Sequence, residues 1–146
     1  MSDLRALATD GVVALGGEVV LLERDHPPEK GRWVLPGGMV ERGETARTAC
    51  AREVHEEVGL DVRPVSFVGL YDAPDRDPRG NVSAAFLCLP AGGAERPEPE
   101  PRSEAQKVGT FEPEDQPDLG FDHGEMIADA LGEIDRVRDY SSVWNR

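Results

Sequence analysis

The sequence predicts an α+β fold in which one mixed β-sheet is flanked by helices on both faces. Two apolar runs joined by Gly16-Gly17 read as a hairpin near the N-terminus. Two helical segments follow, separated by further strand-like runs, and the order of elements does not repeat as βαβ units. Because 146 residues suffice for one substantial core, we expect a single domain over residues 1–146.

Short apolar runs bounded by turn residues predict the strands. The first two contain β-branched and aliphatic residues on either side of the Gly-Gly turn, and a short third strand leads into Pro36-Gly37-Gly38. The residues that follow this strand are predicted to form a glycine-rich loop before the first helix, in which the paired glycines would let the backbone approach a ligand closely. The predicted strands cover residues 6–15, 18–23, 33–35, 62–71, 81–89 and 105–111.

Two segments have the features of helices. In the first, Thr45 is a suitable N-cap, and Gly59 can close the C-terminal end in a left-handed conformation. The second spans about 124–138, with apolar residues at helical spacing that we expect to pack on the sheet. These residues are Met126, Ile127, Ala130, Leu131 and Ile134. The segment 91–103 is rich in Gly, Pro and Glu, so we expect it to be irregular.

Three carboxylates gather at the far end of the first helix. At about 100° per residue, Glu53, Glu56 and Glu57 fall within one arc of the helix, where their like charges repel. A hard divalent cation bound through oxygen would remove that repulsion. The alternative is an acidic helix face that is merely solvated.

The flanking residues favour the metal-binding interpretation. The stretch from Gly38 to Leu60 resembles the Nudix box, G-x5-E-x7-R-E-U-x-E-E-x-G-U, where U is aliphatic. The nine fixed positions are filled by Gly38, Glu44, Arg52, Glu53, Val54, Glu56, Glu57, Gly59 and Leu60. The resemblance implies an α/β/α sandwich and hydrolysis of a nucleoside diphosphate linked to another group. It also implies Mg²⁺ as cofactor, for which Mn²⁺ can substitute.

Residue roles follow from the same resemblance. Glu53, Glu56 and Glu57 correspond to metal ligands, and the carbonyl of Gly37 or Gly38 would complete the inner shell. Two further residues, Glu44 and Arg52, correspond to an ion pair that supports the box.

The general base is left open by the sequence. Some Nudix families use a box glutamate and others an acid on a later loop, for which Glu104 is the best-placed candidate. Glu98 and Glu100 lie in the same acidic stretch, where solvation is the simpler explanation for any one residue.

Two short segments bear on the substrate. The loop 76–80, with Arg76 and Arg79, and the segment 121–123, with His123, resemble ADP-ribose pyrophosphatase-type members of the family. The alternative is a packing role, with Phe121 in the core and His123 as a helix cap. An arginine there can bind a phosphate through two hydrogen bonds. Trp33 and Tyr71 are candidates for stacking an adenine, or else pack in the core.

The expected reaction is therefore conversion of ADP-ribose to AMP and ribose 5-phosphate. One alternative is a MutT-like pyrophosphatase that removes unwanted nucleoside triphosphates. The other is a non-catalytic nucleotide-sensing module, which the complete set of box acids disfavours.

Composition restricts the partners and the compartment. A net charge of −13 argues against nucleic acid, which requires clustered Lys and Arg. No apolar run approaches the roughly twenty residues that span a membrane, and the N-terminus does not resemble a secretory signal. We therefore expect a cytoplasmic protein in which Cys50 and Cys88 are small buried residues. Homodimers are common among the relatives, so a homodimer is expected.

Overall fold

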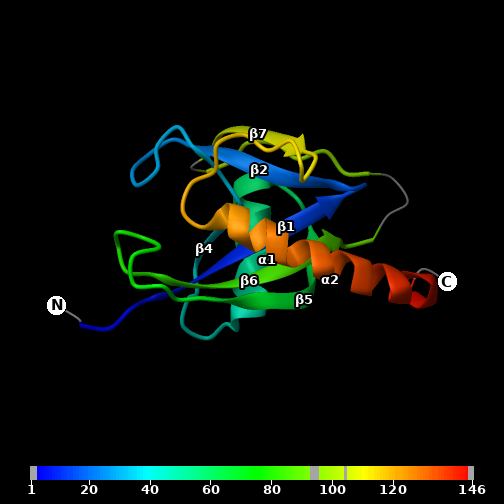
Figure 1. Cartoon of the computed structure of the whole chain (residues 1–146), viewed down its shortest axis with the longest axis horizontal. Helices are drawn as coiled ribbons and strands as arrows, with labels where there is room; N and C mark the ends of the chain where they lie inside the picture. The colour runs from blue at the N-terminus through cyan, green and yellow to red at the C-terminus, as the bar shows by residue number, and fades with distance from the viewer. Residues whose placement is uncertain (1–2, 93–95, 104, 145–146) are drawn as a thin grey trace.

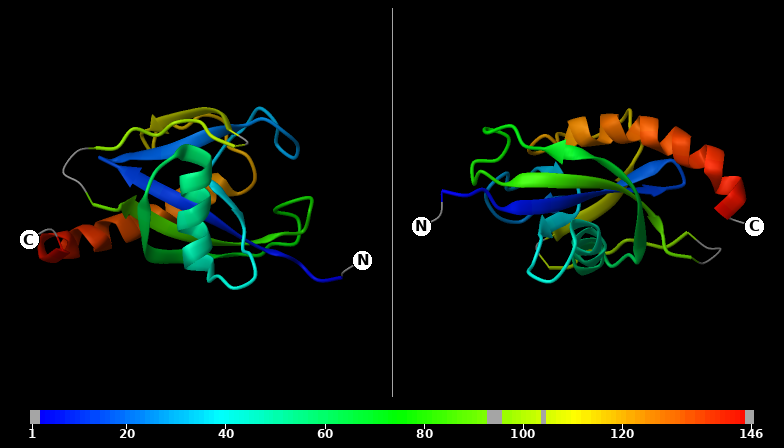
Figure 2. Two further views of the ribbon diagram at one scale, coloured as in Figure 1. Left: turned by 180° about the vertical axis from the view of Figure 1, so that it is seen from behind. Right: turned by 90° about the horizontal axis from the view of Figure 1, so that it is seen from below.

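The structure, a computed structural model, describes residues 3–92, 96–103 and 105–144. Within these residues, seven strands form one mixed sheet whose main path runs β3-β2-β1-β6-β5, with β4 paired to β1 and β7 paired to β2. The helices α1 (Ala46–Val58) and α2 (His123–Trp144) cover opposite faces (Figures 1 and 2). The strands are β1 (Leu7–Leu15), β2 (Glu18–Arg24), β3 (Trp33–Val34), β4 (Gly37–Met39), β5 (Val62–Tyr71), β6 (Val82–Pro90) and β7 (Ala105–Phe111). The predicted fold class is confirmed.

The central strand β1 is apolar on both sides because both faces of the sheet are covered. Successive residues point to opposite faces, so Val13 packs in the cluster beneath α1 and Val12 in the cluster beneath α2. Cys50 and Cys88 are buried on the α1 side with their sulfur atoms 3.7 Å apart, as free thiols. The prediction that both are buried is confirmed.

Helix α1 begins and ends where the sequence predicts. The Thr45 hydroxyl accepts a hydrogen bond from the Thr48 amide at 3.1 Å, and Gly59 adopts φ 71° while its amide bonds the His55 carbonyl. These caps fix the ends of α1, and burial of Cys50, Val54 and Val58 against the sheet fixes its rotation about the helix axis.

Two predictions about local structure are wrong. Residues 37–39 form a strand, β4, rather than a loop, because they pair with β1 in register Asp10↔Gly37 and Thr9↔Gly38. Helix α2 continues to Trp144, since no Gly or Pro follows residue 138 to stop it.

One of the apolar residues assigned to the packing face of α2 does not pack. Met126, Ile127 and Ala130 are buried as expected, but Leu131 is 43% exposed. The side chain of Ile134 lies outside the described residues. Neither helix in the described ranges combines the length and apolarity needed to cross a bilayer.

Candidate active site

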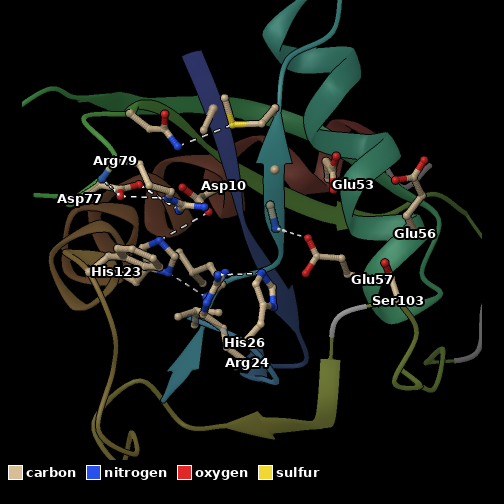
Figure 3. A pocket seen from close by; sticks show the side chains of 18 of the residues that line it. Asp10, Arg24, His26, Glu53, Glu56, Glu57, Asp77, Arg79, Ser103 and His123 are labelled. Atoms are coloured by element: carbon tan, nitrogen blue, oxygen red, sulfur yellow. Dashed lines mark hydrogen bonds and ion pairs between the residues drawn. The ribbon is translucent and has the colours of Figure 1, made fainter. Parts of the chain in front are cut away.

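A cavity of about 390 Å³ opens between α1, β1, β4, the loop 76–81 and the segment that leads into α2. Figure 3 shows the three α1 glutamates on one side of it and Asp77, Arg79 and His123 on the other, with Asp10 between. The cavity therefore has an acidic wall, formed by Glu53, Glu56 and Glu57, and an opposite wall of mixed charge.

The acidic wall includes the three carboxylates that the sequence singled out. Glu57 is 8% exposed, and its Oε1 accepts a hydrogen bond from the Gly37 amide at 3.3 Å. Glu53 and Glu56 both accept hydrogen bonds from Arg52 Nη1, at 2.8 and 3.2 Å. Helix α1 and strand β4 thus meet at this wall, where a carboxylate of the helix contacts the backbone of the strand.

Gly37 and Gly38 of β4 must lack side chains, because neighbouring residues lie too close to leave room for a Cβ atom. A Cβ atom at Gly37 would lie 2.2 Å from the Thr9 carbonyl oxygen, because β4 and β1 pair closely here. A Cβ atom at Gly38 would lie 2.3 Å from Cδ of Glu53. Any side chain at position 38 would therefore displace a carboxylate of the acidic wall.

Arg52 links the acidic wall to the loop that precedes α1. Its Nε and Nη2 bond the two carboxylate oxygens of Glu44 at 3.0 and 2.6 Å, and Nη2 also bonds the Met39 carbonyl at 3.0 Å. These contacts hold the pKa of Glu44 below its usual range. The structure thus contains the Arg52–Glu44 ion pair that the box resemblance implies.

The carboxylate oxygens of the acidic wall are the ligands that a hard divalent cation prefers, and their negative charge complements its positive charge. Burial raises the pKa of Glu53; the nearby Glu56 charge adds to this effect, although Arg52 opposes it. The wall therefore carries negative charge that the protein does not fully neutralise. Among the described residues, no three carboxylate, imidazole or thiolate groups converge tightly enough to hold an ion as they stand. Arg52 bonds Oε1 of Glu53 and Oε2 of Glu56, one oxygen of each carboxylate.

The two loop arginines predicted to bind substrate differ in their contacts. Arg76 is buried and makes two hydrogen bonds of 2.8 Å to Asp122 and one of 2.9 Å to the Asn81 carbonyl. Arg79 uses Nε and Nη2 to bind Asp77, and its Nη1 has no partner among the described residues. Arg76 therefore ties the loop to the start of α2, while Arg79 retains donors for a ligand.

The segment before α2 supplies Phe121 and His123 to the pocket. Phe121 has φ 52°, a left-handed conformation that is unfavourable for a bulky residue. Its ring lies 5.5 Å from the guanidinium of Arg24 and 5.6 Å from that of Arg79. His123, the first residue of α2, is buried and accepts a hydrogen bond from the Leu35 amide at Nδ1.

Three residues that line the pocket, Asp10, Arg24 and His26, were not predicted from the sequence. Asp10 lies in β1, which the sequence predicts simply as an apolar strand. A single carboxylate inside such a strand was the available signal, since burial of a charge is costly and needs a reason.

Other predicted site residues lie elsewhere. Trp33 packs against Phe111 with ring centroids 5.1 Å apart, and the Tyr71 hydroxyl bonds Asp129 at 2.6 Å; neither lines the pocket. Their positions give no support to a stacking role. Glu104 lies outside the described residues, although Ser103 before it lines the pocket.

Comparison with known proteins matches residues 5–130 to the NUDIX domain. An ADP-ribose pyrophosphatase of Methanocaldococcus jannaschii is 40% identical over 126 residues, which make up 86% of this chain and 73% of that protein. A MutT-like protein of Streptomyces ambofaciens is 38% identical over 94 residues, or 64% of this chain and 57% of the relative. The matched range includes both walls of the pocket.

Solved structures show the same arrangement of strands and helices. A bifunctional NMN adenylyltransferase/ADP ribose pyrophosphatase of Francisella tularensis, complexed with AMP and a Mn ion, superposes with a TM-score of 0.77 at 25% identity. The similarity covers 89% of this chain and 42% of the bifunctional protein.

Proposed function

Because this chain belongs to the Nudix family and has its hydrolase box, we propose that it hydrolyses the pyrophosphate bond of ADP-ribose, giving AMP and ribose 5-phosphate. Mg²⁺ is the proposed cofactor, with Mn²⁺ as a substitute. The observation that carries the proposal is the acidic wall: three carboxylates of one helix line the pocket and lie against a pair of glycines in β4. The archaeal relative described as an ADP-ribose pyrophosphatase supports the choice of substrate.

The chemistry requires positive charge at the pyrophosphate. A bound divalent cation supplies that charge and acidifies the attacking water. Glu53, Glu56 and Glu57 would hold it, together with the carbonyl of Gly37 or Gly38. Arg52 orients the wall through its two hydrogen bonds to Glu44. The proton acceptor is one of the three wall glutamates or Glu104.

The opposite wall binds and orients the rest of the substrate. Arg79 has Nη1 donors that can reach a phosphate oxygen, while its contact with Asp77 keeps the guanidinium in place. Arg76 and His123 position this wall, since Arg76 holds Asp122 and His123 holds the Leu35 amide that precedes β4.

Three further parts of the proposal rest on composition and on relatives. With a net charge of −13, the protein binds no nucleic acid. We also propose a homodimer in the cytoplasm, and light scattering during size-exclusion chromatography measures the oligomeric state.

A panel of nucleotides with Mg²⁺ tests the proposed function. We expect ADP-ribose to yield AMP and ribose 5-phosphate, with a higher kcat/KM than any nucleoside triphosphate in the panel. Chelation of the metal should stop the reaction. If ADP-ribose is inert while a triphosphate releases pyrophosphate, the substrate assignment is wrong and the MutT-like alternative, favoured by the Streptomyces relative, takes its place. If no nucleotide is cleaved, the result favours the nucleotide-sensing module over both hydrolases.

A further inference from the structure

The pocket wall that carries Arg79 belongs to a long connection between two paired strands. Strands β5 and β6 pair as far as Tyr71 and Ser83, so residues 72–81 connect them as the β5–β6 loop. Hairpin loops usually contain about two to five residues, and much longer ones commonly carry function. This loop places Asp77, Arg79 and Asn81 on the pocket. Their positions therefore depend on what holds the loop in shape.

The β5–β6 loop has little apolar burial of its own. Its buried residues, Asp77 and Asn81, are both polar. Inside the loop, the Arg76 amide donates to the Ala73 carbonyl at 3.2 Å. A second turn is closed by the Gly80 amide, which donates to the Asp77 carbonyl at 2.8 Å. Because segments with few buried apolar contacts open most easily, restraints from outside the loop matter for its shape.

Arg5 supplies such a restraint from the segment before β1. Its Nε donates to the Gly80 carbonyl at 2.7 Å, and its Nη1 donates to the Asp72 carbonyl at 2.7 Å. Its Nη2 donates to the Ala73 carbonyl at 3.2 Å. Because Asp72 and Ala73 begin the loop and Gly80 lies near its end, one guanidinium joins the two ends. Arg5 thus closes the neck of the β5–β6 loop.

The pairing of β1 with β6 fixes where Arg5 lies. The Val82 amide donates to the Ala6 carbonyl at 2.9 Å, and Leu7 is the parallel partner of Val82. The N-terminal end of β1 and the β5–β6 loop therefore lie at the same end of the sheet (Figures 1 and 2). The Arg5 side chain is exposed and does not line the pocket. Any effect of Arg5 on the substrate must be transmitted by the loop.

Arg76 restrains a different part of the loop. It makes two hydrogen bonds of 2.8 Å to Asp122 and one of 2.9 Å to the Asn81 carbonyl, which tie the end of the loop to the start of α2. Arg79 is held within the loop, because its amide, Nε and Nη2 all bond the Asp77 carboxylate. The Arg79 guanidinium therefore moves with the loop backbone. Opening of the neck displaces it even while the Arg76 contacts remain.

We propose that Arg5 is a positioning residue, which closes the neck of the β5–β6 loop and thereby holds Arg79 where it binds a phosphate of the substrate. The inference rests on the proposed function, because a phosphate of ADP-ribose is the group that Arg79 would bind. Lysine does not replace Arg5 fully, since a single ammonium nitrogen cannot reproduce three donor nitrogens fixed in one plane.

Hydrolysis of ADP-ribose by Arg5→Met and Arg79→Met, alone and combined, tests this coupling. A hydrogen bond to a charged group is generally worth about 10- to 100-fold in binding, which is the rise in KM expected for Arg79→Met. Arg5→Met should raise KM about tenfold with kcat nearly unchanged, the result of losing an interaction made equally with substrate and transition state. Added to Arg79→Met, it should change KM by less than about twofold, because the residue that it positions is then absent. Arg5→Lys should give a KM between those of wild type and Arg5→Met.

Hydrogen exchange of backbone amides, measured without ligand, tests the restraint itself. The Arg76 and Gly80 amides, which are bonded in the turns of the loop, should exchange severalfold faster in Arg5→Met than in wild type. The Gly59 amide at the end of α1 should exchange at the same rate in both proteins. Arg63→Met, the same change at an exposed residue of β5, is the control and should match wild type in KM and in exchange.

The other outcomes contradict the inference. Equal KM values for wild type and Arg5→Met overturn it, and so does an equal rise in KM with and without the Arg79 side chain. Full rescue by Arg5→Lys would assign the effect to charge alone and overturn the positioning role. If Arg5→Met does not fold, Arg5→Lys alone and with Arg79→Met gives the same comparison. If wild type leaves ADP-ribose uncleaved, the proposed function has failed, and unchanged exchange of the loop amides would separately overturn the role of Arg5.

Discussion

Replacing Glu57 with Gln should lower kcat by about 10²- to 10³-fold while the protein remains folded, the usual effect of removing one preorganised electrostatic contact. Glu57 is the most enclosed carboxylate of the acidic wall, and it also accepts the Gly37 amide hydrogen. Glutamine preserves the shape and can still accept that hydrogen. It removes the negative charge that the proposed cation requires. Steady-state hydrolysis of ADP-ribose measures the effect.

The matched control is Glu125→Gln, which makes the same change on an exposed residue in the first turn of α2. Its kcat should equal that of wild type. Thermal unfolding of both variants verifies that the fold survives. Turnover by Glu57→Gln close to that of wild type would remove Glu57 from the metal site.

The two glycines of β4 should respond differently to alanine. At Gly38 the added Cβ meets the carboxylate of Glu53, the mobile end of a side chain, so stability should change little. Displacement of that carboxylate should nevertheless lower kcat/KM by about 10²-fold, the usual cost of misplacing a reacting group by about 1 Å. At Gly37 the Cβ meets the Thr9 carbonyl oxygen, which belongs to the backbone. Gly37→Ala should therefore reduce the free energy of unfolding by about 1–3 kcal/mol.

Gly132→Ala is the control for both variants. Gly132 lies within α2 with no atom within 4 Å of an added Cβ, so alanine should raise stability by about 0.5–1 kcal/mol and leave activity unchanged. Denaturant unfolding and kcat/KM separate the two effects. A Gly38→Ala variant that is fully active would show that the contact between β4 and Glu53 does not matter for catalysis.

Local signals explain which parts of the fold could be predicted from the sequence. Gly16-Gly17 fixes a hairpin, and Thr45 and Gly59 act within one turn of the helix that they cap. Because Glu53, Glu56 and Glu57 fall within one arc of a helix, the wall that they share could also be predicted. The metal role rests on the box, since clustered glutamates alone are also typical of a solvated face.

Long-range pairing explains what the sequence could not specify. Residues 37–39 form a strand because β1 lies beside them, and nothing within the segment indicates a strand. The surroundings of Asp10 could not be predicted either, because its neighbours Ser83 and His123 come from β6 and α2, which are distant in the sequence. Arg76 and Arg79 lie three residues apart in the same loop. Only their partners in the structure show that Arg76 has a structural role, bound to Asp122, whereas Arg79 keeps hydrogen-bond donors for a ligand.

Binding of Mn²⁺, followed by the electron paramagnetic resonance signal of the free ion, tests the role of the acidic wall most directly. The titration is carried out with α,β-methylene ADP-ribose, which cannot be cut between its phosphorus atoms. Wild type should remove Mn²⁺ from solution, and Glu57→Gln should bind it at least about tenfold more weakly, since loss of even a supporting residue commonly costs about 10- to 100-fold in metal affinity. Equal affinity in wild type and Glu57→Gln, or no binding by wild type, would contradict a metal site at this wall.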